Sequence, residues 1–388
     1  MIYLDHAATS YPKPPCVYRA LANAAARLGA NPGRGGYRMA LETTEALYRC
    51  RESAAALFGL SDPRRVVLMP NCTTALNTAI KGLLSNGGHA VASDLEHNAV
   101  LRPLHAAASH YTLAHVSPDD DETVRAFAEA ITPHTRLLVC THASNVTGQV
   151  LPVRRLAALA HEHGLPLVVD AAQSAGIVPI DVEGDALDYV CVAGHKGTFG
   201  PMGTGLLLCR DDTPLPTLVE GGTGSASLAP TPPLDLPERL ESGTPNVWGF
   251  CALGAGLEWV RARGTQAIAA HELSLAARVY DALSSFSHVR LCSPPPKRGR
   301  STAVISFVVD GMTSEEAAHT LACGGLAVRA GLHCAPTAHR TLGTLPDGAV
   351  RLSFGAFNTR QDAENCIQFL KKIRSNALFF MRNYDKMK

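Results

Sequence analysis

Between about residues 60 and 210, short apolar runs alternate with helical patterns, and this alternation restricts the fold more than any other feature. The apolar runs lie at 66–69, 90–92, 137–140, 165–169, 189–192 and 206–209. Helical patterns cover 73–84, the stretch from about 97, and 153–162. Short apolar runs are typical of strands buried on both faces, and their alternation with helices indicates a mostly parallel sheet. We therefore predict an α/β fold with ligands at the carboxyl ends of the strands.

A smaller α+β unit is predicted to follow this sheet. Two stretches rich in Pro and Gly, 211–216 and 220–237, are typical of long surface loops. Beyond them we predict helices at 247–263, 265–286, 314–323 and 359–373, strands at 303–309, 327–329 and 350–354, and a break at 293–296. The tail, 374–388, is either frayed or docked, and both remain open.

Length and charge exclude several classes of protein. A chain of 388 residues suggests about two domains, and 46% hydrophobic with 18% charged residues is globular composition. The net charge of +1 argues against a nucleic-acid partner. No apolar run reaches the length of a membrane span, so we expect no membrane partner. The first residues, MIYLDHAATSYP, lack the apolar stretch of a signal peptide, so secretion is not expected.

The eleven cysteines indicate reduced thiols rather than a metal site. No two are spaced as C-x-x-C, so paired-cysteine zinc and iron–sulfur sites have no local support, and we expect no metal. Scattered cysteines in a chain of this size suggest a cytoplasmic protein. Most should be small buried hydrophobic residues, and a reactive one must be recognised from its neighbours.

An aspartate and a lysine at the ends of two successive predicted strands suggest a cofactor. Asp170, in VVDAAQS, would by itself be read more readily as a helix cap or turn residue. Lys196 lies in Gly-His-Lys-Gly after the next strand, where burial would lower its pKa and make it a nucleophile. A lysine for a Schiff base and an acid for the pyridinium nitrogen are what pyridoxal phosphate requires.

Two further segments suit the other parts of that cofactor. Asn71-Cys72-Thr73-Thr74 follows a strand and opens a helix, and a helix N-terminus binds phosphate through its N–H groups. A plain helix cap by Asn71 or Thr73 is compatible with this role. His97 follows another strand and could stack on the ring, although alone it is a weak signal.

Seven motifs in order resemble one enzyme family. They are MIYLDHAATS, LEHN (95–98), SNVTG (144–148), VVDAAQS (168–174), AGHKGTFGPMGTG (193–205), ESGTPN (241–246) and RAGLHCAP (329–336). The chain resembles the class V aminotransferase family, specifically its cysteine desulfurase and selenocysteine lyase branch, from about residue 2 to 373. The resemblance implies pyridoxal-phosphate fold type I, with a mostly parallel seven-stranded sheet in which 206–209 runs antiparallel. It also implies a large domain at 15–255, and a small one from 1–14 and 256–388.

The resemblance implies roles for particular cofactor-binding residues. Lys196 would bind pyridoxal 5′-phosphate covalently, Asp170 would pair with its ring nitrogen, and Gln173 would hydrogen-bond its phenolic oxygen. His97 would stack on the ring and help to move a proton. The residues at the cofactor's phosphate would be Thr73, His195, Cys72 and Thr244. Thr244 would reach the phosphate of a partner subunit, which implies a homodimer.

The resemblance also selects the reaction. Asn145 and Arg351 would bind the substrate, because a guanidinium matches a carboxylate with two parallel hydrogen bonds, and Arg329 would lie close by. Cys334 would attack the sulfur of L-cysteine, release alanine and carry a persulfide for a small thiol or an acceptor protein. His333 and Arg329 could favour its thiolate. A separation of 17 positions from Cys334 to Arg351 indicates a short catalytic loop.

Three departures from the family pattern suggest a divergent subfamily. Ala193 and Cys72 stand where many relatives have hydroxyl residues, and Leu332 stands where the commonest form has a histidine. The substrate therefore stays open among cysteine, selenocysteine, cysteine sulfinate and a larger thioether. An aminotransferase in which Cys334 merely packs, and a non-catalytic sulfur-relay protein, are the alternatives from other classes. Retention of Lys196 and Asp170 argues against the relay protein.

Overall fold

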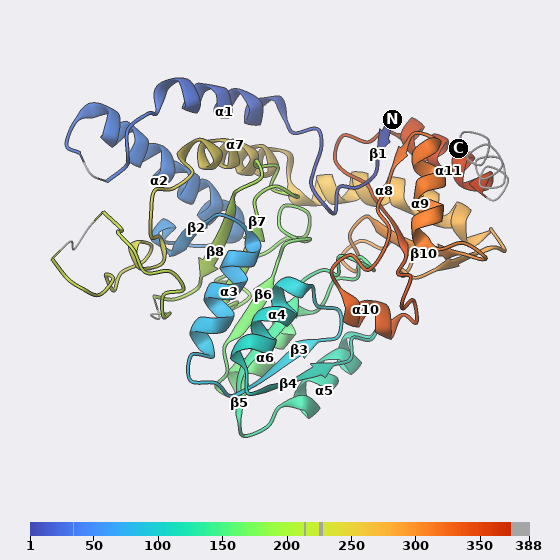
Figure 1. The fold of residues 1–388 in the computed structure, drawn as a ribbon, viewed down its shortest axis with the longest axis horizontal. Coiled ribbons are helices and arrows are strands. Elements are labelled where there is room, and N and C mark those ends of the chain that lie inside the picture. The colour runs from blue at the N-terminus through green and yellow to red at the C-terminus, as the bar shows by residue number, and fades with distance from the viewer. Residues whose placement is uncertain (34, 213–214, 225–227, 374–388) are drawn as a thin grey trace, which may run out of the picture. The chain divides into compact units, whose positions relative to one another are not determined.

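The chain folds into two compact units, each with its own core (Figure 1). The computed structural model describes residues 1–33, 35–212, 215–224 and 228–373. The large unit comprises Lys13–His142 and Leu151–Thr265, and the small unit comprises Met1–Pro12, Ala143–Val150 and the chain from Gln266 onward. The expected boundaries, 14/15 and 255/256, differ from these. Sequence analysis also did not separate Ala143–Val150 from the large domain.

The segment Ala143–Val150 belongs to the small unit because its main chain is bonded there. The N–H of Val150 donates to the carbonyl of Arg300 at 2.9 Å, and the hydroxyl of Ser306 donates to the carbonyl of Val146 at 2.6 Å. A short excursion of this kind carries no periodic pattern, so local sequence reading could not detect it.

A seven-stranded sheet forms the centre of the large unit (Figure 1). Its order is β2 (Val66–Met69), β8 (Gly205–Cys209), β7 (Tyr189–Ala193), β6 (Leu167–Asp170), β5 (Thr135–Thr141), β3 (His89–Ser93) and β4 (His110–Ala114). The strand β8 is antiparallel to both neighbours, and the other pairs are parallel. The prediction of a mostly parallel seven-stranded sheet with one antiparallel strand is confirmed.

Helices cover both faces of this sheet. The crossovers through α3 (Cys72–Leu83) and α4 (Asn98–Ala107) advance toward β4, whereas those through α5 (Asp120–Ala130) and α6 (Val153–Glu162) return toward β7. Because such crossovers are right-handed, the two pairs lie on opposite faces. The helices α1 (Pro15–Arg27) and α2 (Arg38–Phe58) pack on α7 (Val247–Arg263). Sequence analysis did not predict the helices α1, α2 and α5, and it did not predict the half-exposed edge strand β4.

The small unit is built on two small sheets. One pairs β1 (Ile2–Tyr3) with β11 (Leu326–Ala327), and the other has the order β12 (Val350–Ser353), β10 (Val304–Val309) and β9 (Val289–Leu291). Its helices are α8 (Thr265–Ser284), α9 (Ser314–Cys323), α10 (Pro336–Thr341) and α11 (Arg360–Lys371). Thr313 and Thr359 begin α9 and α11 with capping boxes, which fix where these helices start. The tail considered above, 374–388, lies outside the described residues.

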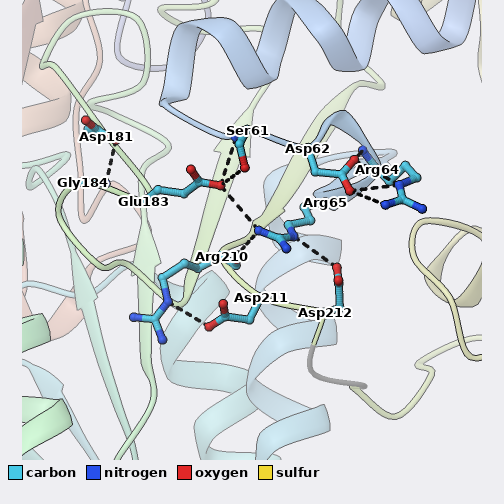
Figure 2. A network of polar contacts seen from close by, with 10 residues as sticks. All are labelled: Ser61, Asp62, Arg64, Arg65, Asp181, Glu183, Gly184, Arg210, Asp211 and Asp212. Atoms are coloured by element: carbon cyan, nitrogen blue, oxygen red, sulfur yellow. Dashed lines mark hydrogen bonds and ion pairs between the residues drawn. The ribbon is translucent and has the colours of Figure 1, made fainter.

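The two ends of the large sheet differ in chemistry. Beside the start of β2, Arg65 binds Glu183 and Asp212, and Glu183 accepts from Ser61 (Figure 2). Pairs of this kind at the surface contribute little stability and indicate a solvated edge. The strands β2, β6 and β7 run in the same direction, because β2 and β7 are both antiparallel to β8 and β6 is parallel to β7. Their carboxyl ends therefore all lie at the opposite end of the sheet. That edge carries the predicted chemistry.

In the described parts of the chain, the helices are too short or too polar for any of them to cross a membrane.

Candidate active site

Asp170 ends β6 as a buried carboxylate, only 4% exposed. Its Oδ1 accepts from the N–H of Ala172 at 2.9 Å and lies 3.6 Å from the Sγ of Cys72. Burial and, next, the charge of Asp170 raise the pKa of Cys72 well above its usual range, and the charge of Lys196 opposes them. Cys72 is therefore a neutral thiol that donates to Asp170, so the structure brings these two predicted residues together.

Lys196 lies half-buried in the loop that follows β7. Burial, with smaller contributions from the charges of Lys196 and Lys13, lowers the pKa of its neighbour His195 to about 4. Lys13 donates from Nζ to the carbonyl of His195 at 3.0 Å, and burial lowers its own pKa to about 8. Two lysines beside a neutral imidazole form an electropositive cluster that suits an anion such as a phosphate.

Sequence analysis did not single out Lys13. The sequence feature that could have drawn attention to Lys13 is its position between Pro12 and Pro14, shortly after the LDHAATS motif. A lysine held between prolines has a restricted main chain, but nothing in the local pattern reveals that it reaches a loop about 180 residues further on.

Two glycines bring the Asp170 turn against the Lys196 loop. A Cβ at Gly197 would lie 2.4 Å from the carbonyl oxygen of Ala175, and a Cβ at Gly176 would lie 2.2 Å from that of Gly197. Only glycine permits such an approach of two main chains. Gln173 lies half-buried on the same turn. The large unit thus places Asp170, Gln173 and Lys196 on adjacent loops.

The start of α3 lies at the same edge of the sheet. Asn71 caps the helix, because its Oδ1 accepts from the N–H of Thr74 at 2.8 Å, and Thr73 is exposed at the first turn. Gly205 of β8 lies so close that a Cβ there would be 2.5 Å from the carbonyl carbon of Asn71. An exposed hydroxyl and N–H groups at a helix start form a suitable phosphate site.

Thr244 is exposed in the Gly-Thr-Pro-Asn turn. It lines a cavity of about 610 Å³ together with Thr74 and Gly203. Glu241, at the start of the ESGTPN segment, forms a bidentate ion pair with Arg51 of α2, each N···O distance being 2.6 Å. Sequence analysis did not predict this ion pair, which fixes the segment that carries Thr244.

His97 caps α4 through its ring. Its Nδ1 accepts from the N–H of Ala99 at 3.0 Å, so that nitrogen carries no proton. The preceding residue, Glu96, is fully buried; its Oε1 accepts from Ser93 Oγ at 2.5 Å and from the N–H of Thr141 at 2.7 Å. Its Oε2 has no hydrogen-bond partner among the described residues. Burial raises the pKa of Glu96 to about 8, so it holds a proton at neutral pH.

The predicted substrate-binding residues meet within the small unit. Arg351, 2% exposed, donates from one terminal nitrogen to the carbonyl of Asn145 and from the other to Asp5, both at 3.0 Å. The main chains of Arg329 and Arg351 form an antiparallel bridge. A guanidinium has five N–H donors, so these two bonds leave three for a ligand. Sequence analysis did not predict that Asp5 would accept a hydrogen bond from Arg351.

Cys334 is exposed, as is Cys323, whereas the other nine of the eleven cysteines are buried or partly buried. His333 and Cys334 both have positive φ, 49° and 56°. Asn145 holds the loop, because its Nδ2 donates to the carbonyl of His333 at 2.8 Å. Burial lowers the pKa of His333 to about 2, so this ring is neutral and supplies no positive charge to a thiolate. The expectation that His333 favours the thiolate therefore has no support from a charge on this ring.

The predicted residues thus form two sets, one in each unit. The large unit holds Asp170, Gln173, Cys72, Thr73, His195, Lys196, His97 and Thr244, and the small unit holds Asn145, Arg329, Arg351 and Cys334. Among the described residues, no three His, Cys, Asp or Glu side chains gather as metal ligands would.

The buried Asp170, the two lysines and the exposed start of α3 are groups of the kinds that bind pyridoxal phosphate. An acid for a ring nitrogen, an amine for an aldehyde and cations with N–H groups for a phosphate are all present within the large unit.

Comparison with known proteins identifies the family. The chain matches the model of the family described as aminotransferase class-V over residues 2–366. It is 30% identical to a probable cysteine desulfurase of Synechocystis sp., covering 98% of this chain and 92% of that protein. It is 31% identical to a probable cysteine desulfurase of Methanothermobacter thermautotrophicus, covering 96% and 94%. The apo structure of a cysteine desulfurase from Thermococcus onnurineus NA1 superposes with a TM-score of 0.86, at 28% identity, over 96% of this chain and 94% of that one.

Proposed function

We propose, on the premise that this chain belongs to the class-V aminotransferase family of pyridoxal-phosphate enzymes, that it is a cysteine desulfurase. It converts L-cysteine into L-alanine and keeps the sulfur as a persulfide on Cys334. The observation that carries this proposal is the exposed Cys334 in a loop held by Asn145, which itself binds Arg351. The names of the relatives support the same activity.

The large unit supplies the groups that hold the cofactor. Lys196 would bind its aldehyde, Asp170 its ring nitrogen and Gln173 its phenolic oxygen, and His97 would lie against the ring. The N-terminus of α3, with Thr73 and the main-chain N–H of Cys72, would hold the phosphate together with His195, because the Cys72 thiol itself donates to Asp170. When bound, pyridoxal phosphate supplies an electron sink for negative charge at the substrate's Cα.

The chain's own residues carry the proton and sulfur transfers. Arg351 and Asn145 bind the substrate carboxylate, with Arg329 beside them, and Lys196 Nζ removes the Cα proton. The Sγ of Cys334 attacks the substrate sulfur as a thiolate, so one S–S bond forms and one C–S bond breaks. Cysteine and one enzyme thiol thus become alanine and one enzyme persulfide. This covalent step divides a difficult cleavage into two easier ones.

The proposal includes a homodimer, a sulfur acceptor and a cellular location. Thr244 is exposed on a cavity of about 610 Å³, which supports a homodimer in which Thr244 reaches the partner's phosphate site. The persulfide passes to a small thiol or an acceptor protein. All eleven cysteines are free thiols, which supports a cytoplasmic location.

Replacement of Cys334 tests the reaction class. Purified enzyme loaded with cofactor is incubated in parallel with L-cysteine, L-selenocysteine and L-cysteine sulfinate, and alanine is measured. We expect cysteine to be the preferred substrate, Cys334→Ala to lose alanine formation from it, and the cofactor absorbance to remain.

Cys323→Ala is the matched control, because Cys323 is the other exposed thiol and its removal should leave turnover unchanged. Full turnover of cysteine by Cys334→Ala would refute the proposal in favour of an aminotransferase. Preferred turnover of selenocysteine or the sulfinate would replace cysteine as the substrate.

A further inference from the structure

A chain of three buried side chains lies behind the Cys334 loop. His333 Nδ1 is 3.3 Å from His339 Nε2, and His339 Nδ1 is 2.7 Å from Thr344 Oγ1. His339 is fully buried, His333 is 5% exposed, and their rings stack with centroids 5.5 Å apart. None of the roles assigned above uses His339 or Thr344.

The positions of the protons in this chain follow from its geometry. The hydroxyl of Thr344 donates to the carbonyl of His339 at 3.2 Å, so its oxygen accepts from His339 Nδ1–H. Burial lowers the pKa of His339 to about 4, so the ring is neutral and its Nε2 is an acceptor. His333 therefore donates from Nδ1 to His339. This polarity gives every N–H and O–H of the chain an acceptor.

The surroundings of His333 keep its ring neutral. Burial is the main cause, the positive charges of Arg351 and Arg329 add to it, and a hydrogen bond to the main chain of Arg329 opposes it. Its Nε2 has no hydrogen-bond partner among the described residues. The ring is thus held by His339 and by the main chain of Arg329, while Asn145 holds the carbonyl of the same residue.

The loop needs such anchoring because of its main-chain conformation. The main chains of His333 and Cys334, two successive non-glycine residues, both adopt the left-handed conformation. This conformation costs free energy and persists only where the surroundings enforce it. The turn is closed by one bond, from the N–H of Ala335 to the carbonyl of Leu332 at 2.8 Å. The short helix α10 begins at Pro336 without a side-chain cap at Ala335. Local bonds alone therefore do little to fix Cys334.

We propose that His339 and Thr344 are positioning residues that act through the His333 ring to hold the Cys334 loop in its left-handed conformation for attack on the substrate sulfur. The proposal rests on the function proposed for Cys334. Neither residue is assigned a contact with the substrate, and each acts through the His333 ring.

Hydrogen–deuterium exchange tests the anchoring without using activity. In Thr344→Val, which keeps the shape and removes the hydroxyl, we expect the amides of residues 331–335 to exchange about tenfold faster. Thr344→Ser keeps the hydroxyl and should behave as the wild type. His339→Phe should give the same local acceleration, and the double variant should add nothing. Amides of β10 and α9 should stay protected in all of them.

The same variants are then assayed with cysteine in the cofactor-loaded enzyme. We expect Thr344→Val to lower kcat about tenfold with KM nearly unchanged, because the thiol is misplaced only for the sulfur step. Unchanged exchange of the loop, loss of protection throughout the small unit, or a Thr344→Ser variant that behaves like Thr344→Val would overturn the proposal. If the wild type releases no alanine from cysteine, the proposed function fails, whereas the exchange result still decides whether the loop is anchored.

Discussion

At the scale of single residues, Glu96 shows how burial sets a protonation state that local sequence does not reveal. It precedes His97 in LEHN and reads as an ordinary surface acid. In the structure it bonds Ser93 and the main chain of Thr141, and its second oxygen is buried with no hydrogen-bond partner in the part of the chain that the structure describes. Burial disfavours the charged carboxylate more than these bonds stabilise it, so the protonated form is favoured.

The raised pKa of Glu96 predicts a pH dependence of stability. Between its ordinary value near 4.5 and its folded value of about 8, the folded chain keeps this proton and the unfolded chain loses it. The contribution of Glu96 to stability is therefore fully present below about pH 4.5 and lost as the pH rises through 8. Relative to Glu96→Gln, the wild type should lose about 1.4 kcal/mol per pH unit within this window.

Urea unfolding of both proteins between pH 5 and 8 measures this difference in the free energy of unfolding. Glu45→Gln, at an exposed position on α2, should show no such trend and serves as control. A difference between Glu96→Gln and the wild type that stays flat with pH would show that Glu96 is ionised in the folded protein.

At the scale of elements, the Arg51–Glu241 pair joins α2, β2 and the ESGTPN segment. Arg51 also donates to the carbonyl of Val66 at 2.5 Å, and Glu241 accepts from the N–H of Leu68 at the same distance. Both side chains are largely buried, in contrast to the solvated pairs of Figure 2. Buried pairs hold their partners in register, and breaking one leaves an uncompensated charge.

Glu241→Ala should therefore be strongly destabilising, by about 3–5 kcal/mol, because it leaves Arg51 buried without its partner. Replacing both residues, Arg51→Leu with Glu241→Leu, should restore much of that loss. Urea unfolding measures each variant, and Glu45→Ala, which breaks an exposed pair, should cost no more than about 0.5 kcal/mol. If the double variant were as unstable as Glu241→Ala, an unpaired Arg51 would not be the cause.

Elements with a strong local pattern could be predicted from the sequence. The helices α6, α7 and α9 have the predicted limits, and the buried strands β2 and β7 lie where apolar runs indicated them. The strand β4 was missed because half of it is exposed, whereas α5 was missed although its acidic first turn is a helix-start signal. The pair β1–β11 joins Ile2 to Leu326, and no local pattern encodes a partner so distant.

At the scale of the whole molecule, motifs revealed the residues whose types are chemically unusual, and geometry revealed their supports. Lys196 and Asp170 stand out because a lysine and an acid at buried strand ends are costly. Asp5, Lys13, His339 and Thr344 carry no such signal, since each acquires its part only through a residue distant in the sequence or hidden in the fold. Assigning them required the structure.

The central claim is that Cys334 receives the sulfur of cysteine, and a single-turnover experiment with excess cofactor-loaded enzyme tests it most directly. Alanine is measured after quenching, and the peptide containing Cys334 is weighed by mass spectrometry beside the peptide containing Cys323. We predict one alanine for each Cys334 peptide that gains one sulfur atom, with the Cys323 peptide unchanged. Alanine formed while the Cys334 peptide keeps its original mass, or formed equally fast by Cys334→Ala, would contradict this account.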